Sequence, residues 1–183
     1  MSTLGAQVPD RAEARTRAAM ELIKTRASVE ELIYREARFL DEKKWHEWLA
    51  LYTEDAVFWM PSWAGEYETT SDPELELNLV YLKGRGHLED RVFRLETEDS
   101  FASVPMARTT HVVGGVMVDE TSEAEIIARA SWMVHSYGLH GPLTRGGWYE
   151  YRLRRDGDAL KIARKKNTMI DDKLVGPVDF FHV

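Results

Sequence analysis

The sequence predicts an α+β protein in which a mostly antiparallel sheet carries helices on one face. Two helical patterns come first, between residues 28 and 52, and long strand patterns joined by short turns fill the second half. Helices followed by consecutive hairpins are typical of this class. The chain has 183 residues and no internal repeat or linker, so we expect one domain with a substantial core.

The first helix is predicted to begin at Ser28, because Glu31 follows at the spacing of a capping box. Apolar residues then form one helical stripe, made of Val29, Ile33, Ala37 and Leu40. We therefore divide the chain into an N-terminal extension, residues 1–27, that is helical or frayed, and a single α+β domain, residues 28–183.

A second, short helix is predicted from Trp45 to Tyr52, where apolar residues recur at helical spacing. A strand follows over residues 56–60 and is expected to end at Pro61, which cannot donate a ladder hydrogen bond. Residues 62–73 are expected to form a loop.

Apolar residues alternate from Leu75 to Tyr81, which favours a half-buried strand. Asp72-Pro73 is also a good helix start, so a helix stays open here. A turn over residues 83–86 and a helix over residues 87–95 follow.

The second half predicts four strands, over residues 108–118, 125–137, 148–155 and 160–170. His140-Gly141-Pro142 is expected to interrupt the strand pattern, and Asp156-Gly157 is typical of a hairpin turn. Gly114-Gly115 indicates a β-bulge or a close backbone approach. Such a sheet, if strongly curved, would enclose a cone against the helices.

Composition argues against several classes of function. Residues 27–142 hold ten basic and twenty-two acidic side chains, and an acidic body repels the phosphates of nucleic acids. Apolar runs are far shorter than the roughly 20 residues that span a bilayer. The first residues lack the apolar region of a signal peptide, so we expect a cytoplasmic protein without membrane contacts.

The sequence offers no evident set of catalytic, metal-binding or cofactor-binding residues. There is no cysteine, whereas a Rieske cluster needs two Cys and two His. His135 and His140 are the closest histidines, but neither helix nor strand spacing puts both on one face, as an iron site would need. No nucleophile elbow, dinucleotide fingerprint or P-loop is present.

Four segments, in order, carry a resemblance to a known family. They are IYREARFLDEKKWHEWLALYTEDAVFWMP (33–61), HLEDRVFRLETE (87–98), ARTTHVVGGV (107–116) and DFFHV (179–183). They resemble the small, or beta, subunits of aromatic-ring-hydroxylating dioxygenases, closest to the branch that acts on benzoate and related aromatic carboxylates. The resemblance covers roughly residues 28–183.

The resemblance implies a cystatin-like fold of the nuclear-transport-factor type, with N-terminal helices packed on the concave face of a strongly curved sheet. It implies an α3β3 hexamer in which this chain contacts the large (alpha) subunit and other copies of itself in a trimeric ring. A 2Fe–2S Rieske cluster and a mononuclear Fe(II) would lie in the large subunit, which dihydroxylates an aromatic ring with O2 and electrons from NADH, delivered by a reductase. This chain would be a non-catalytic scaffold without cofactors.

The same fold class leaves a second interpretation open, that of a standalone isomerase-like or dehydratase-like enzyme. Such enzymes use a carboxylate or histidine as a base inside the cavity. The candidates here are Tyr34, Asp41, Asp55 and His111. Asp41 also has an ordinary role at a helix end, and Asp55 has one in a turn.

Aromatic and arginine side chains favour protein interfaces. The aromatic candidates for subunit contacts are Trp63, Tyr67, Trp148, Phe180 and Phe181. The last two belong to an apolar tail, which another subunit would need to cover. Arg91, Arg94 and Arg108 complete the interface candidates. Cross-subunit pairing is one interpretation of these arginines. The other is internal pairing with the neighbouring acidic residues Glu89, Asp90, Glu96, Glu98 and Asp99.

Overall fold

The structure, a computed structural model, describes residues 11–97, 104–139, 141–157, 159–176 and 178–183. The helices are α1 (Arg11–Asp41), α2 (Trp45–Leu49) and α3 (Arg85–Glu96), and a short 3-10 helix, η2, spans Phe180–His182. The strands are β1 (Tyr52–Pro61), β2 (Asn78–Lys83), β3 (Arg108–Thr121), β4 (Ile126–Gly138), β5 (Gly141–Asp156) and β6 (Ala159–Met169).

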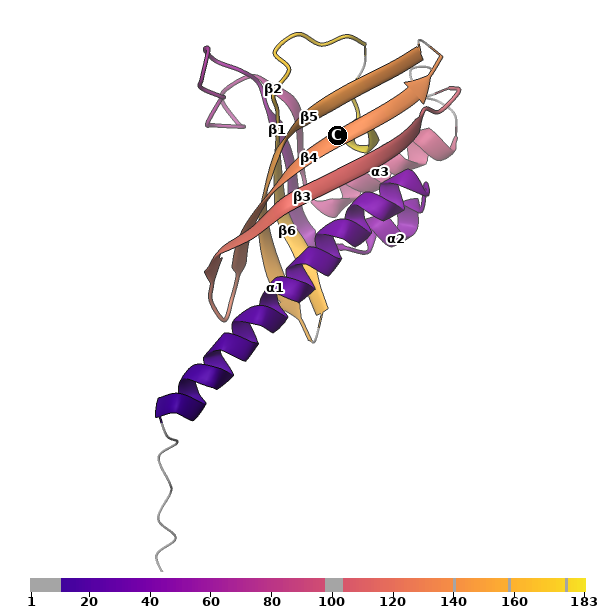
Figure 1. Cartoon of the computed structure of the whole chain (residues 1–183). Coiled ribbons are helices and arrows are strands. Elements are labelled where there is room, and N and C mark those ends of the chain that lie inside the picture. Colours follow the sequence, from indigo (N-terminus) through magenta and orange to yellow (C-terminus); the bar gives the residue numbers. More distant parts are fainter. Residues whose placement is uncertain (1–10, 98–103, 140, 158, 177) are drawn as a thin grey trace, which may run out of the picture.

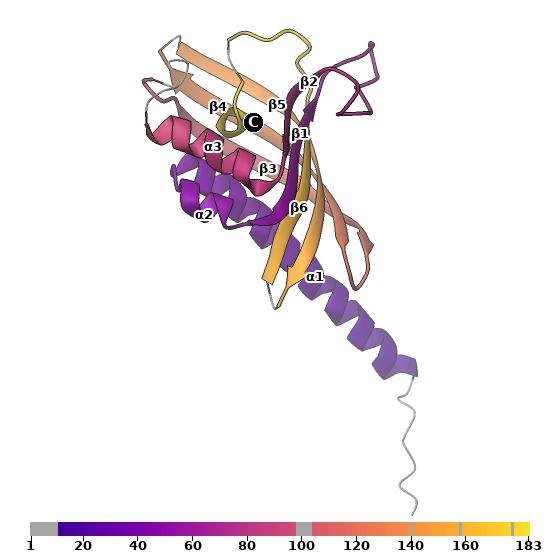
Figure 2. The ribbon, with the colours of Figure 1, turned by 180° about the vertical axis from the view of Figure 1, so that it is seen from behind.

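The strands form a six-stranded sheet in the order β2-β1-β6-β5-β4-β3. β1 runs parallel to β6, and the other neighbouring pairs are antiparallel. The helices gather on one side of the sheet, with α1 along β3 and α3 beside β1 (Figure 1, and from behind in Figure 2). The predicted α+β class with a mostly antiparallel sheet is confirmed.

The core lies between the sheet and the helices because alternate strand residues point to one face. In β4 the buried residues alternate with exposed ones from Ile126 to Ser136. Tyr149 and Tyr151 of β5 continue this inner face, where Trp132 stacks on Tyr149 with ring centroids 5.4 Å apart. This face packs against the buried stripe of α1, which includes Val29 and Ile33.

The helix predicted to begin at Ser28 is already formed at Arg11, so that prediction of its start is wrong. Residues 11–27 are rich in Ala, Arg and Glu, which are good helix formers, and they carry the helix past the capping signal. The helix ends at Asp41, because Lys43 adopts a left-handed φ of 58°. The amides of Lys43 and Lys44 then donate to the carbonyls of Leu40 and Phe39, as in a Schellman motif.

Two strand predictions need correction. Leu75 and Leu77 are 86% and 82% exposed, and the strand there begins only at Asn78. The carboxylate of Glu76 accepts hydrogen bonds from the amides of Ser71 and Asp72, which closes a turn in place of an extended chain. β5 begins at Gly141 and contains Pro142, which was expected to break the strand, because proline is tolerated near the start of a strand. His140 lies outside the described residues.

The glycine signals are confirmed. The β3–β4 register shifts after Gly114, and Gly115 takes a φ of 62°, as expected of a bulge. Gly157 lies in the turn between β5 and β6 with a φ of 60°. None of the helices formed by the described residues is both long and apolar enough to cross a membrane.

Candidate functional site

A buried carboxylate, that of Glu36, lies between α1 and the sheet. It accepts hydrogen bonds from the hydroxyls of Tyr52 (2.5 Å) and Tyr151 (2.8 Å). The ammonium of Lys165 donates to both carboxylate oxygens, at 2.9 and 3.1 Å. None of the four residues is more than 1% exposed. The group is therefore a closed polar network inside the core.

Burial sets the charge states of this network. Burial lowers the pKa of Lys165, and the charge of Glu36 and its hydrogen bond oppose that effect. Burial and the Glu36 charge raise the pKa values of Tyr52 and Tyr151 well above 10.0, so both tyrosines remain hydrogen-bond donors. Because no member reaches solvent, the network stabilises one packing of the core and does not present a group to a substrate.

This network was not predicted from the sequence, although one signal points to it. Glu36 lies on the apolar stripe of its helix, three residues after Ile33 and four before Leu40. A charged residue at that spacing needs a buried partner. Lys165 supplies it from an inward position of β6, where it alternates with exposed or half-buried residues.

Two of the four cavity candidates, Asp41 and His111, lie together. One oxygen of Asp41 accepts from the backbone amide of His111 at 2.8 Å, and the other lies 2.6 Å from His111 Nδ1. The His111 side chain is 1% exposed, and its Nε2 has no hydrogen-bond partner among the described residues. A carboxylate that holds one ring nitrogen fixes the orientation of the imidazole, as in histidine bases of enzymes.

The ionisation of this pair is tuned by its surroundings. Burial acts to raise the pKa of Asp41, but the hydrogen bonds and the charge of His111 outweigh it, and the pKa is lowered. Lys43 lies at the same end of α1 and donates to Thr109 at 3.2 Å. Burial lowers its pKa to about 8, against the opposing charge of Asp41.

We expect the variant Asp41→Asn to be less stable by about 1–2 kcal/mol at pH 6, because it loses a hydrogen bond to a charged group. A depressed carboxylate pKa contributes stability above its unfolded value, near 3.8, that is lost as the pH falls through the folded value. The difference between wild type and variant should therefore shrink below pH 3.8 in urea titrations. The exposed Asp90→Asn is the control, and an equal pH dependence in both variants would contradict the assignment.

Tyr34 and Asp55 do not join this pair. Tyr34 is 44% exposed on α1. Asp55 is exposed and forms an ion pair with Arg154 at 2.7 Å, which lowers its pKa. Both side chains reach solvent, so the prediction that they line a cavity is wrong, and they lie on the surface.

Two interface candidates meet on the surface. Trp63 and Trp148 are in edge-to-face contact, with ring centroids 6.3 Å apart. The indole N–H of Trp63 donates to the carbonyl of Met169 at 2.9 Å. Trp148 remains 37% exposed, and Tyr67, in the loop that follows Trp63, is 85% exposed. Trp148 and Tyr67 therefore remain accessible as interface candidates on this surface.

The three candidate arginines have different surroundings. Arg91 lies 3.3 Å from Asp179, an ion pair within the chain. Arg108 lies over the ring of Tyr137, at 5.3 Å from its centroid. Arg94 is exposed. Glu98 and Asp99, two of the expected internal partners, lie outside the described residues.

Phe180 and Phe181 are core residues, which corrects their prediction as interface residues. They are 1% and 0% exposed. Phe180 stacks on Trp48 with centroids 4.6 Å apart, and both phenylalanines contact Trp45. The tail is covered by the chain's own second helix, an arrangement that local sequence does not encode.

No group of three or more His, Asp or Glu side chains within the described part of the chain is placed to hold a metal ion. The fold itself is that of nuclear-transport-factor-2-like proteins with a cystatin-like fold. One such protein from Novosphingobium aromaticivorans superposes with a TM-score of 0.63, covering 91% of this chain and 94% of that chain at 17% identity.

Within this fold class, the sequence matches the ring hydroxylating beta subunit family over residues 35–175. The chain belongs to that family and is a subunit of an aromatic-ring-hydroxylating dioxygenase complex. It is 40% identical over 151 residues to the 2-halobenzoate 1,2-dioxygenase small subunit of Burkholderia cepacia, covering 82% of this chain and 92% of that protein.

Two further relatives agree. The benzoate 1,2-dioxygenase subunit beta of Acinetobacter baylyi is 34% identical over 155 residues, covering 85% of this chain and 92% of that protein. The crystal structure of the benzoate 1,2-dioxygenase beta subunit of Burkholderia mallei superposes with a TM-score of 0.71 at 36% identity, covering 86% of this chain and 96% of that chain. The resemblance to the benzoate-type branch is confirmed.

Proposed function

We propose that this chain is the non-catalytic scaffold of its dioxygenase, and that it holds a large subunit which dihydroxylates an aromatic carboxylate in the cytoplasm. In this proposal three large and three small subunits form the oligomer, and the small subunits make a trimeric ring. The sheet curves strongly around the helices to give each small subunit a cone shape. The observation that carries the proposal is the family match over residues 35–175.

The redox groups belong to the large subunit in this proposal. A Rieske cluster needs thiolate ligands, and the 183 residues contain no cysteine. The 2Fe–2S cluster would therefore be held by the partner. In this proposal the partner also holds the mononuclear Fe(II), and electrons come from NADH through a reductase. The names of the relatives support an aromatic carboxylate as substrate, because the dioxygenases to which they belong are named for 2-halobenzoate, benzoate and toluate.

The surface of the chain supports an assembly role. Residues 11–24 of α1, which we call the helical arm, are all exposed and project beyond the sheet (Figures 1 and 2). Met20, Leu22 and Ile23 on this arm are 54%, 60% and 68% exposed. An isolated helix of this length is marginal in water, so contact with a neighbouring subunit would stabilise it.

We expect this chain, carrying an affinity tag, to co-purify with its large subunit, and oxygenase activity to require both. The double variant Met20→Glu/Ile23→Glu should reduce recovery of the complex at least fivefold, because it places charges on the proposed contact. Leu75→Glu/Leu77→Glu is the matched control, since both leucines are exposed in a turn away from the arm. Size-exclusion chromatography measures the outcome. An active, monomeric chain that needs no partner would contradict the proposal.

The Asp41–His111 pair favours a second candidate, a standalone enzyme that removes a proton from a small substrate. His111 Nε2 would be the base, oriented through Nδ1 by Asp41, and a substrate would reach this buried nitrogen only after a local opening. This candidate predicts isomerase or dehydratase activity of the purified chain alone, abolished in His111→Ala. Inactivity of the lone chain toward ketosteroid-like and hydroxylated aromatic substrates would leave the pair a structural role.

A further inference from the structure

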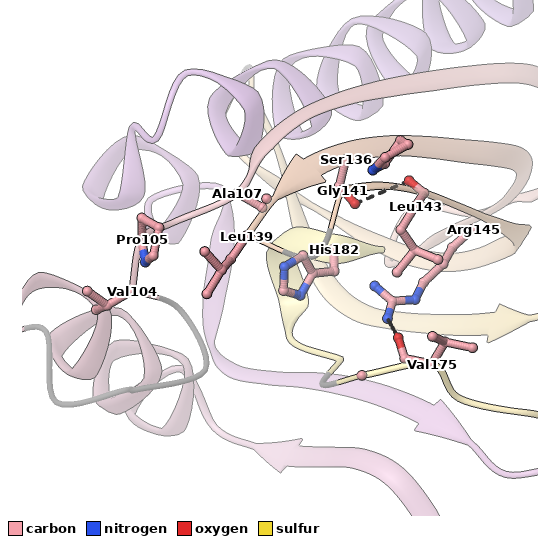
Figure 3. A pocket seen from close by; sticks show the side chains of 13 residues that line it. Val104, Pro105, Ala107, Ser136, Leu139, Gly141, Leu143, Arg145, Val175 and His182 are labelled. Carbon is pink, nitrogen blue, oxygen red and sulfur yellow. Dashed lines mark hydrogen bonds between the residues drawn. The ribbon is translucent and has the colours of Figure 1, made fainter.

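A cavity of about 290 Å³ opens at one end of the sheet, where the ends of β3, β4 and β5 meet the segment that leads into η2 (Figure 3). Three polar side chains line it from three different elements: Ser136 of β4, Arg145 of β5 and His182 of η2. They are 7%, 6% and 9% exposed. The other described lining residues are glycine or apolar, and include Pro105, Ala107, Leu139, Leu143 and Val175.

Among the described residues of this lining, Arg145 is the one with a charged side chain. Its guanidinium donates to the carbonyl of Val175 at 3.3 Å, which holds it at the cavity wall (Figure 3). Burial lowers its pKa, while the charge of Asp171 opposes that change. A guanidinium stays protonated in proteins, so the cavity contains a permanent positive charge that has lost most of its water. Such a charge favours an anionic ligand.

His182 adds a neutral polar group to the same cavity. Burial lowers its pKa to about 4, and the charges of Arg145 and Lys43 and the nearby His111 act in the same direction. At pH 7 the imidazole is therefore neutral. Its Nδ1 accepts a hydrogen bond from the backbone amide of Asp179 at 3.3 Å, which leaves the proton on Nε2.

The volume and the walls limit the ligand further. A dry apolar cavity of about 150 Å³ is enough to hold benzene. A space of about 290 Å³ is large enough for a ring of that size together with one carboxylate. Proline, leucine and valine side chains around it suit an apolar body rather than a sugar or a nucleotide.

We propose that this cavity binds a small organic monocarboxylate with a compact apolar body, its carboxylate directed toward Arg145 and its body against Ala107 and Leu143. Arginine is the residue that matches a carboxylate in both charge and geometry. The apolar walls stabilise the body by removing it from water. All the lining residues named here belong to this chain, so the proposal does not rest on the proposed assembly.

The test is calorimetric titration of the full chain with benzoate at pH 7, because its ring has the size of benzene. We expect one benzoate per chain. Benzamide has the same shape without the charge, and we expect it to bind at least tenfold more weakly. The absence of benzoate binding at millimolar concentration, or equal binding of the two compounds, would overturn the proposal.

Three variants locate the site. Arg145→Met should weaken benzoate binding at least tenfold, whereas Arg152→Met, the same change at an exposed position of the same strand, should leave it unchanged. Ala107→Phe fills the cavity while keeping the charge, so it tests the site even where Arg145→Met does not fold. Benzoate binding that survives Ala107→Phe with unchanged affinity places the ligand elsewhere and refutes the assignment.

Discussion

Replacement of Lys165 by methionine is expected to lower the free energy of unfolding by about 3–5 kcal/mol, because it leaves a buried charge without its partner. The carboxylate of Glu36 is 1% exposed and would keep only the hydroxyls of Tyr52 and Tyr151 as donors. Urea denaturation at pH 7, followed by circular dichroism, measures the change.

The matched control is Arg154→Met, which breaks the exposed ion pair with Asp55 and should cost less than about 1 kcal/mol. The double variant Glu36→Gln/Lys165→Met should recover part of the loss, because it removes the unpaired charge and retains an acceptor for a tyrosine. A Lys165→Met protein as stable as Arg154→Met would show that the network contributes little.

Phe180→Ala is expected to destabilise the protein by about 3–5 kcal/mol through loss of buried surface and the cavity left behind. The ring is 1% exposed and stacks on Trp48 at 4.6 Å, with a second contact to Trp45. Thermal and urea unfolding measure the loss. Phe93→Ala removes a ring that is 61% exposed on α3 and should change stability by less than about 0.5 kcal/mol. Similar losses in both variants would contradict the core role of the tail.

The periodic part of the fold could be predicted from sequence. The four long strands of the second half and the turn at Gly157 follow from alternation and turn chemistry, which are local properties. The start of α1 could not be found this way, because Ser28 and Glu31 imitate a helix start inside a longer helix. The turn before Asn78 depends on side-chain hydrogen bonds of Glu76, which compete with the strand pattern.

The candidate site was predicted only in part, for a different reason. Asp41 and His111 were named separately from their residue types, but their contact joins positions 70 residues apart. The partners of Glu36 lie up to 129 residues away, on β6. Phe180 and Phe181 were predicted as interface residues, because nothing near them in the sequence covers an apolar tail. Contacts over such separations are set by the tertiary fold, which the local patterns do not encode.

The parallel pairing of β1 with β6 has a consequence for the order of folding. In β1, residues 57–59 pair with residues 164–166 of β6. The backbone groups on that edge of β1 therefore have no strand partner until about a hundred further residues have been synthesised. During synthesis the N-terminal half of the chain therefore leaves the ribosome while backbone N–H and C=O groups on one edge of the apolar strand β1 lack hydrogen-bond partners. Non-local strand pairing of this kind folds slowly and exposes the nascent chain to aggregation. We expect chaperone dependence and expression temperature, more than final stability, to limit the yield of this subunit.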